Sequence, residues 1–242
     1  MVFMKKPRSK TQQVALAAVF AAVYVVLRSI PTFQMIGISG RFTAGDFLLT
    51  SIALLIGLWG GALAVIIGTI LAYAVNPPIF FGLDFVPALT NVSVVGLVLL
   101  NRLSLVRTLY LGLLLAFLVS PYSLLFAYDY VPYAWLHIVA LIILLSPYAN
   151  RFQPWVKNDR PRQVGSLAVL AFLGTMAQHL VGGLLYEAAA GVVGGINPVG
   201  FQQIWGIIFW LYPTERLVIV SISTIVAVAL IRSTEKFASN FP

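Results

Sequence analysis

The chain has 242 residues, of which 60% are hydrophobic and only 9% are charged, and its mean hydropathy is +0.97. A soluble domain cannot cover so much apolar surface with so few charges, so the composition predicts an all-α integral membrane protein, a polytopic helical bundle. The absence of cysteine excludes disulfides, thiolate metal sites and thiol nucleophiles. The net charge of +8 does not indicate nucleic-acid binding, because the basic residues lie in short segments between apolar runs.

The first expected helix runs from Thr11 to Ile30 and ends at Pro31, after a basic tail, residues 1–10. No small-residue cleavage site follows it, so we interpret it as a span and not as a signal peptide. Residues 31–44 are expected to form a loop that leads to Asp46, a plausible helix N-cap.

The apolar stretch Gly45–Val75 is too long for one span, because a helix of this length measures about 45 Å and the hydrocarbon core about 30 Å. We expect two short helices that turn at Trp59-Gly60-Gly61. The later expected helices cover residues 85–100, 108–128 with a kink at Pro121, 133–146, 164–188 and 213–232. Between them, residues 150–163 are expected to form a basic cytoplasmic loop, residues 191–200 a Gly-rich loop, and residues 201–212 a re-entrant or interfacial piece.

The charges test this topology. With eight spans and both termini cytoplasmic, the inner side receives Lys5, Lys6, Arg8, Lys10, Arg102, Arg107, Arg151, Lys157, Arg160, Arg162, Arg232 and Lys236. The outer side keeps three basic residues, Arg28, Arg41 and Arg216, and most of the acids. A single span over residues 45–75 would place the basic loops outside, against the positive-inside rule. The sequence therefore predicts one multi-pass membrane domain over residues 1–242.

Motifs of catalysis are missing from the sequence. It contains no G-x-x-x-x-G-K-[ST], H-E-x-x-H or G-x-S-x-G, and its two histidines, His137 and His179, lack metal-ligand spacing. We therefore expect no catalytic residue, no metal site and no cofactor, and we do not expect an enzyme.

Polar residues gather toward the predicted outer face, where aromatic side chains lie at a similar depth. Convergent polar groups with aromatic walls are typical of a small-molecule pocket. The candidate substrate-binding residues are Arg41, Asp46, Asn76, Asp84, Asn91, Glu187, Asn197, Glu215 and Arg216. Other interpretations stay open: Asp46 as a cap, Glu215 with Arg216 as a structural bridge, and Gln178 or His179 in interhelical hydrogen bonds. Arg41 and Arg216 favour an anionic ligand, unless the nearby acids neutralise them.

Small residues recur four apart at Gly60, Ala64, Gly68 and Ala72, and again at Ala17 and Ala21. This spacing puts them on one helix face, where another helix can approach closely. The strips serve either internal packing or the docking of a partner.

The first 100 residues resemble the substrate-binding (S) component of energy-coupling factor (ECF) transporters. The matching features are the basic N-terminal residues, Ala17-x-x-x-Ala21, Gly45-Asp46-Phe47, the break of the apolar stretch at residues 58–62, and Phe81–Pro87 before the helix expected at residues 85–100. Phe81–Pro87 and residues 212–217 also look like uncharacterised prokaryotic members of the family.

This resemblance implies a prokaryotic cell-membrane protein that captures a vitamin or similar micronutrient from outside. Its partners would be a transmembrane coupling protein, docked on Ala17, Ala21 and the neighbouring strip, and two cytoplasmic ATPases. The family core has six spans, so residues 108–149 would be an inserted hairpin. The alternatives are a self-sufficient secondary transporter or channel, and an intramembrane lipid-modifying enzyme.

Overall fold

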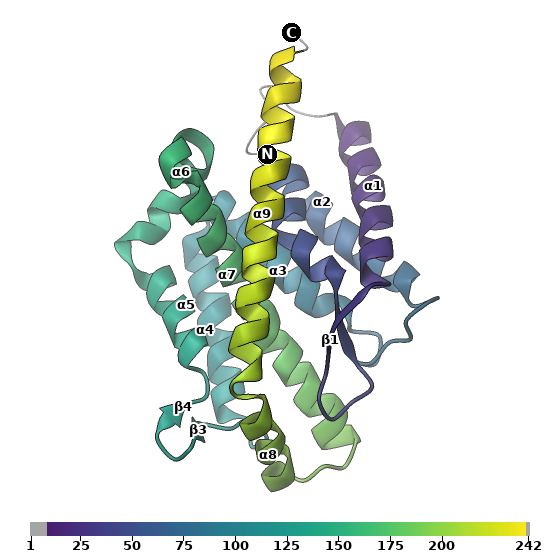
Figure 1. The fold of residues 1–242 in the computed structure, drawn as a ribbon, viewed down its shortest axis with the longest axis vertical. Helices are drawn as coiled ribbons and strands as arrows, with labels where there is room; N and C mark the ends of the chain where they lie inside the picture. Colours follow the sequence, from purple (N-terminus) through teal and green to yellow (C-terminus); the bar gives the residue numbers. More distant parts are fainter. Residues whose placement is uncertain (1–8, 241–242) are drawn as a thin grey trace.

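The computed structural model describes residues 9–240, with side chains to residue 234, and it is mostly helical (Figure 1). The expected charges at Lys5, Lys6 and Arg8, and the side chains of Glu235 and Lys236, lie outside this part. The helices are α1 (Lys10–Arg28), α2 (Leu49–Ala72), α3 (Phe85–Leu99), α4 (Leu103–Val119), α5 (Trp135–Leu145), α6 (Phe152–Asn158), α7 (Arg160–Tyr186), α8 (Pro198–Ile208) and α9 (Leu211–Asn240).

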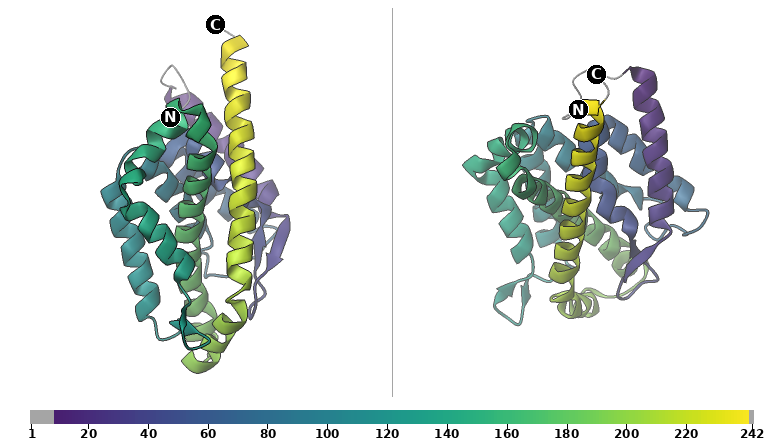
Figure 2. Two further views of the ribbon diagram at one scale, coloured as in Figure 1. Left: turned by 60° about the vertical axis from the view of Figure 1, so that its left-hand side comes forward. Right: turned by 45° about the horizontal axis from the view of Figure 1, so that its top comes forward.

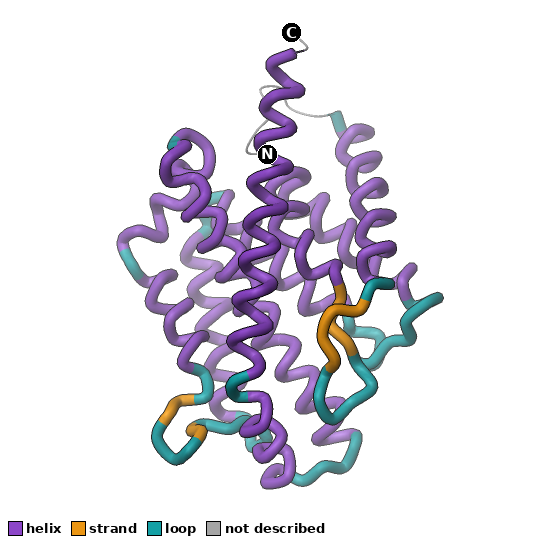
Figure 3. Tube along the Cα trace, in the orientation of Figure 1, coloured by secondary structure: helices purple, strands orange, loops and turns teal. Residues whose placement is uncertain are grey.

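Short strands and loops gather at the end of the bundle opposite the start of α1 and the C-terminal end of α9 (Figure 3). Strand β1 (Pro31–Gln34) pairs antiparallel with β2 (Arg41–Thr43), and β3 (Phe126–Ala127) pairs with β4 (Val131–Pro132). A 3₁₀ turn, Ala44–Leu48, joins β2 to α2. We call this end, with both strand pairs and α8, the loop end.

Helix α2 is broken at Gly57, whose φ of 76° and ψ of −177° are not helical. A Cβ on Gly61 would lie 3.9 Å from the Cα of Ala53, whereas eight residues of a continuous helix span about 12 Å. The chain therefore folds back, and the two arms of α2 pack against each other. The predicted fold-back is confirmed, but its turn lies at Gly57 and not at Trp59-Gly60-Gly61, since Gly57 is the glycine of α2 that adopts a positive φ.

Helix α7 occupies the middle of the bundle, and most of its side chains are buried. It contacts α3, α4, α5, α6 and α9. Helix α9 runs along one face of the bundle, and its C-terminal end extends beyond the other helices (Figure 2).

Several boundaries differ from those expected. Helix α4 ends at Val119, so Pro121 follows the helix and does not kink it, and a strand pair replaces the expected helix up to residue 128. The expected loop 150–163 instead holds α6 and the start of α7, and a π-helix, Glu187–Val193, takes up part of the expected Gly-rich loop. The piece at residues 201–212 belongs to α8 and the start of α9.

Within the described residues, four helical segments are long and apolar enough to cross a membrane. They are Lys10–Arg28, Ala44–Ala72, Arg160–Val193 and Leu211–Thr234. Helix α5 and residues 147–158 form a pair bent by 63°, which makes a fifth segment if it is counted as one span. These segments suggest a protein embedded in a membrane.

The small-residue strips pack against each other inside the chain. Ala17 and Ala21 of α1 are buried, as are Ala64, Gly68 and Ala72 of α2, while Gly60 is half-buried. A Cβ on Gly68 would lie 3.0 Å from the carbonyl oxygen of Ala21 and 2.8 Å from the ring of Tyr24. These residues therefore let α1 approach α2 closely, which is the internal role that the sequence left open.

Replacing Gly57 by alanine tests the fold-back. Nothing lies within 4 Å of the added Cβ, so the only cost is the backbone conformation, about 1–3 kcal/mol. We expect a lower midpoint of thermal unfolding in detergent. Gly112→Ala is the matched control, since that Cβ also meets nothing and Gly112 lies within regular helix α4. Equal midpoints for Gly57→Ala and the wild-type protein would contradict the strained turn.

Candidate functional site

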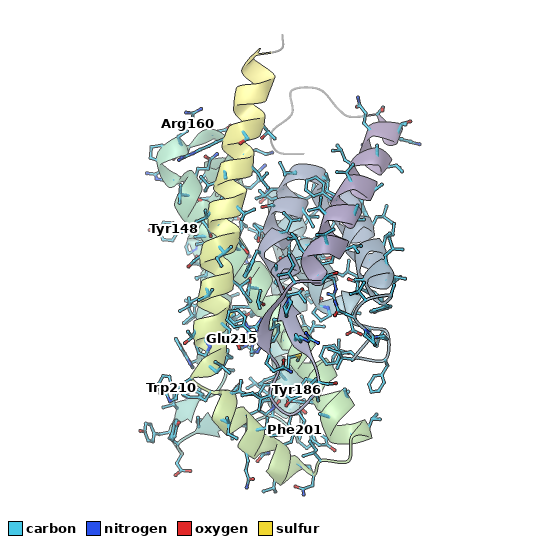
Figure 4. All side chains as sticks on the ribbon, turned by 45° about the vertical axis from the view of Figure 1, so that its right-hand side comes forward. Tyr148, Arg160, Tyr186, Phe201, Trp210 and Glu215 are labelled. Carbon is cyan, nitrogen blue, oxygen red and sulfur yellow. The ribbon has the colours of Figure 1, made fainter. Side chains whose placement is uncertain are left out.

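A cavity of about 120 Å³ lies near the loop end of the bundle, roughly ten times the space that one water molecule needs. Its wall comes from the C-terminal end of α1, the β1–β2 hairpin, the 3₁₀ turn, the start of α3, the C-terminal part of α7, α8 and the start of α9. Figure 4 shows Glu215 of α9 and Tyr186 of α7 near the β1–β2 hairpin. Segments from most of the chain length thus enclose one space.

A buried hydrogen-bond bridge forms one side of the cavity. Nε2 of Gln178 donates to Oδ1 of Asp46 over 2.7 Å, and Oε1 of Gln178 accepts from Nδ2 of Asn91 over 2.8 Å. The bridge joins the 3₁₀ turn, α7 and α3. Oδ2 of Asp46 accepts from the backbone N–H of Thr43 over 3.4 Å. Thr43 is the N-cap of the 3₁₀ turn and Asp46 lies three residues after it, so Asp46 supports the cap but is not the N-cap that the sequence predicted.

Among the residues whose side chains are described, Arg216 is the largest that is fully buried, with 1% of its surface exposed. Its Nη2 donates to Oε2 of Glu215 over 3.4 Å, and its guanidinium lies 4.2 Å from the ring centre of Phe42. Its Nε is buried without a hydrogen-bond partner. A buried guanidinium normally satisfies its donors, so this N–H is the kind of group that a ligand would bind.

Arg28, at the end of α1, lines the same cavity, and its Nε is likewise buried without a hydrogen-bond partner. Nδ2 of Asn76 donates to the backbone carbonyl of Arg28 over 3.0 Å and so fixes the end of the helix. Asn76 does not itself line the cavity.

Asp84 lines the cavity, but its two oxygens accept hydrogen bonds from the backbone N–H groups of Ile79 and Phe80, over 3.0 and 3.1 Å. These bonds hold the loop before α3 in place. The carboxylate is therefore already occupied by the protein backbone.

Aromatic and apolar side chains complete the wall. The hydroxyl of Tyr186 donates to the carbonyl of Ile36 in the β1–β2 hairpin, and the hairpin thereby closes over the cavity. Trp205 of α8 packs edge-on against Tyr186, with ring centres 5.4 Å apart. The cavity thus combines two unpartnered guanidinium N–H groups with aromatic and apolar side chains.

Glu187 lies outside the cavity, in a buried cluster of its own. Its carboxylate accepts from the hydroxyls of Ser120 and Ser123, and from Nε1 of Trp205 over 3.2 Å. The cluster ties the start of the π-helix to the segment after α4 and to α8, which is a structural role.

Five of the nine sequence-predicted binding residues line the cavity: Arg41, Asp46, Asp84, Glu215 and Arg216. Asn91 reaches it only through Gln178, and Asn197 caps α8 by accepting from the N–H of Gly200. The prediction did not include Arg28, Phe42 or Gln178. The sequence could have indicated Gln178, because it is a polar amide within an apolar helix. It makes the interhelical hydrogen bond that the sequence suggested.

A stack of polar rings leads away from the cavity. Nδ1 of His179, a cavity residue, lies 3.1 Å from Nε2 of His137, and Nδ1 of His137 lies 3.3 Å from the hydroxyl of Tyr110. Tyr212 stacks on both histidines. Within the described residues, no group of three or more His, Cys, Asp and Glu side chains is arranged to hold a metal ion.

Comparisons with protein-family models, with curated proteins and with solved structures gave no match. The cavity is therefore interpreted from its own geometry.

Replacing Gln178 by leucine tests the bridge. The change leaves the Asp46 carboxylate and the Asn91 amide buried with fewer partners, and each lost partner costs about 1–3 kcal/mol. We expect a large drop in the thermal midpoint. Gln202→Leu removes one exposed hydrogen bond to Pro121 and should change the midpoint little. Similar midpoints for the two variants would show that the bridge does not stabilise the bundle.

Proposed function

We propose that this protein is the substrate-capture subunit of an uptake transporter of the ECF type, which binds a vitamin or similar micronutrient outside and releases it inward. The observation that carries the proposal is the cavity, which is lined by distant segments of the chain, lies near one end of the bundle and has unpartnered polar groups. A partly open site at one end of the bundle suits capture from one side of the membrane. Energy for release would come from a coupling protein and two cytoplasmic ATPases.

The charge distribution supports the orientation that we propose. Around the end of the bundle that carries the termini lie the basic residues Lys10, Arg102, Arg107, Arg151, Lys157, Arg160, Arg162 and Arg232, with Asp159 the one described acid among them. The other described acids are Asp46, Asp84, Asp129, Glu187 and Glu215, and they lie toward the loop end. By the positive-inside rule the termini would be cytoplasmic and the cavity would open outward.

Eight passes fit this orientation. With α2 counted as two arms, the eight passes would be α1, the two arms of α2, α3, α4, α5, α7 and α9, each opposite in direction to the one before. Helices α4 and α5 with the β3–β4 pair would be the pair added to a six-helix core. They enter and leave at the basic end, as an inserted hairpin requires.

The coupling protein would dock on the outward face of α1. The strip expected for docking, Ala17 and Ala21 with the small residues of α2, is covered inside the chain. The exposed face of α1 still offers Ala15, Ala18 and Ala22, which also permit a close helix approach.

Co-expression tests the proposal. The chain, produced together with candidate coupling proteins and ATPases, should purify as a complex and drive ATP-dependent uptake in proteoliposomes. A chain that never forms such a complex, or that transports a solute alone, would contradict it.

Tryptophan substitution tests the docking face. Ala18→Trp and Ala22→Trp add bulk to an exposed face, so they should abolish co-purification with the coupling protein and leave the thermal midpoint unchanged. Leu115→Trp, on an exposed face of α4, is the control that should assemble normally. Normal assembly of the α1 variants would remove this face from the proposal.

The stacked histidines favour a second candidate, a proton-coupled secondary transporter. His137 and His179 form a hydrogen-bonded pair that reaches the cavity, and such pairs can carry protons in membrane proteins. Uptake by the purified chain alone, driven by a pH gradient without ATP, would support this candidate. His137→Gln should then abolish the uptake.

A further inference from the structure

We propose that the cavity binds a small organic anion, with its carboxylate or phosphate group held by Arg28 and Arg216 and its apolar body packed against Tyr186 and Trp205. This inference rests on the proposed role of the cavity as a capture site, and it adds the chemical class of the ligand.

The wall holds three acids, Asp46, Asp84 and Glu215, beside three arginines, so the preference for an anion rests on which groups lack a hydrogen-bond partner and not on net charge. Asp84 accepts two backbone N–H groups, and Asp46 accepts from Gln178 and from the N–H of Thr43. The third acid, Glu215, accepts from Arg216. Each of these carboxylates is thus held in place by donors of the protein itself.

The arginines, in contrast to the acids, have buried hydrogen-bond donors without a partner. Nε of Arg216 and Nε of Arg28 are both buried without a hydrogen-bond partner, and both side chains line the cavity. A guanidinium has five N–H donors and no acceptor, so only an acceptor-rich group can satisfy these N–H groups. Carboxylate and phosphate are the groups that match guanidinium geometry best.

Phe42 contacts the Arg216 guanidinium and helps to fix its position in the cavity wall. The Cζ atom of Arg216 lies over the Phe42 ring at 4.2 Å from its centre, while Nε keeps no hydrogen-bond partner. The stack and the ion pair with Glu215 hold the group in place before a ligand arrives, which lowers the cost of ordering it.

The rest of the wall selects an organic ligand over an inorganic ion. Apolar side chains such as Met35, Ile79 and Ile208 line the cavity together with the rings of Tyr186 and Trp205. An inorganic phosphate would leave these surfaces without a partner. A ring or short apolar chain that carries the anionic group would cover them.

Ligand-induced stabilisation of the purified full-length chain tests the inference, because a ligand that binds only the folded state raises the thermal midpoint. The probes are three matched pairs: nicotinate with nicotinamide, biotin with biotin amide, and pyridoxal 5′-phosphate with pyridoxal. We expect at least one anion to raise the midpoint when its neutral partner at the same concentration does not. Whether the responding anion is a carboxylate or the phosphate ester distinguishes the two head groups.

Variants locate the effect in the cavity. Arg28→Gln should weaken binding of the responding anion by about tenfold or more, the loss expected for a hydrogen bond to a charged group. Arg216→Lys keeps a positive charge beside Glu215, so the fold should survive, but it removes the planar donors and should weaken binding similarly. Arg102→Gln, at the basic end, should bind like the wild-type protein.

Native mass spectrometry of the purified chain gives an independent check, in which any co-purifying small molecule should carry a carboxylate or phosphate. A neutral or cationic occupant, equal responses within every probe pair, no response to any anion, or full affinity in Arg28→Gln would each overturn the inference. ATP-dependent uptake of a neutral or cationic solute by the assembled complex would overturn only the ligand class and leave the proposed function intact.

Discussion

Gln178 binds Asp46 on one side and Asn91 on the other, and this bridge holds three separate parts of the bundle together next to the cavity. An apolar bundle provides few partners for a buried carboxylate, so the amide of α7 fixes where the 3₁₀ turn and α3 lie. Ser223 of α9 also donates to the backbone carbonyl of Asp46 over 3.5 Å. The arrangement of the wall follows from the need to satisfy these buried polar groups.

The polar groups near the loop end fall into two classes. One class supports the fold: Asp84 orders a loop, Glu187 ties three segments together, Asn76 fixes the end of α1 and Asn197 caps α8. The other class retains unpartnered atoms that line the cavity, and its members are Arg28 and Arg216. The two classes differ in whether their polar atoms have hydrogen-bond partners. The sequence does not show this difference, because both classes lie near the same end of the bundle.

The segments from α1 to the second arm of α2 pack closely together and also support the cavity wall. The small residues of α1 and of the second arm of α2 let their backbones approach, and this contact leaves the opposite face of α1 exposed. The turn at Gly57 divides the apolar residues of α2 into two antiparallel arms. The β1–β2 hairpin that follows α1 then lies over the cavity, where Tyr186 binds it.

The sequence by itself determined the membrane class, the fold-back within residues 45–75 and the existence of most helices, because composition, helix length and loop charge are local properties. It also placed Arg41, Asp46, Asp84, Glu215 and Arg216 in one region. Only the tertiary structure decided that Arg28 and Gln178 join them, that Glu187 and Asn197 do not, and that Ala17 and Ala21 face inward. Those outcomes depend on which side chains share a contact, and residues as far apart as 46 and 178 meet only when the helices pack.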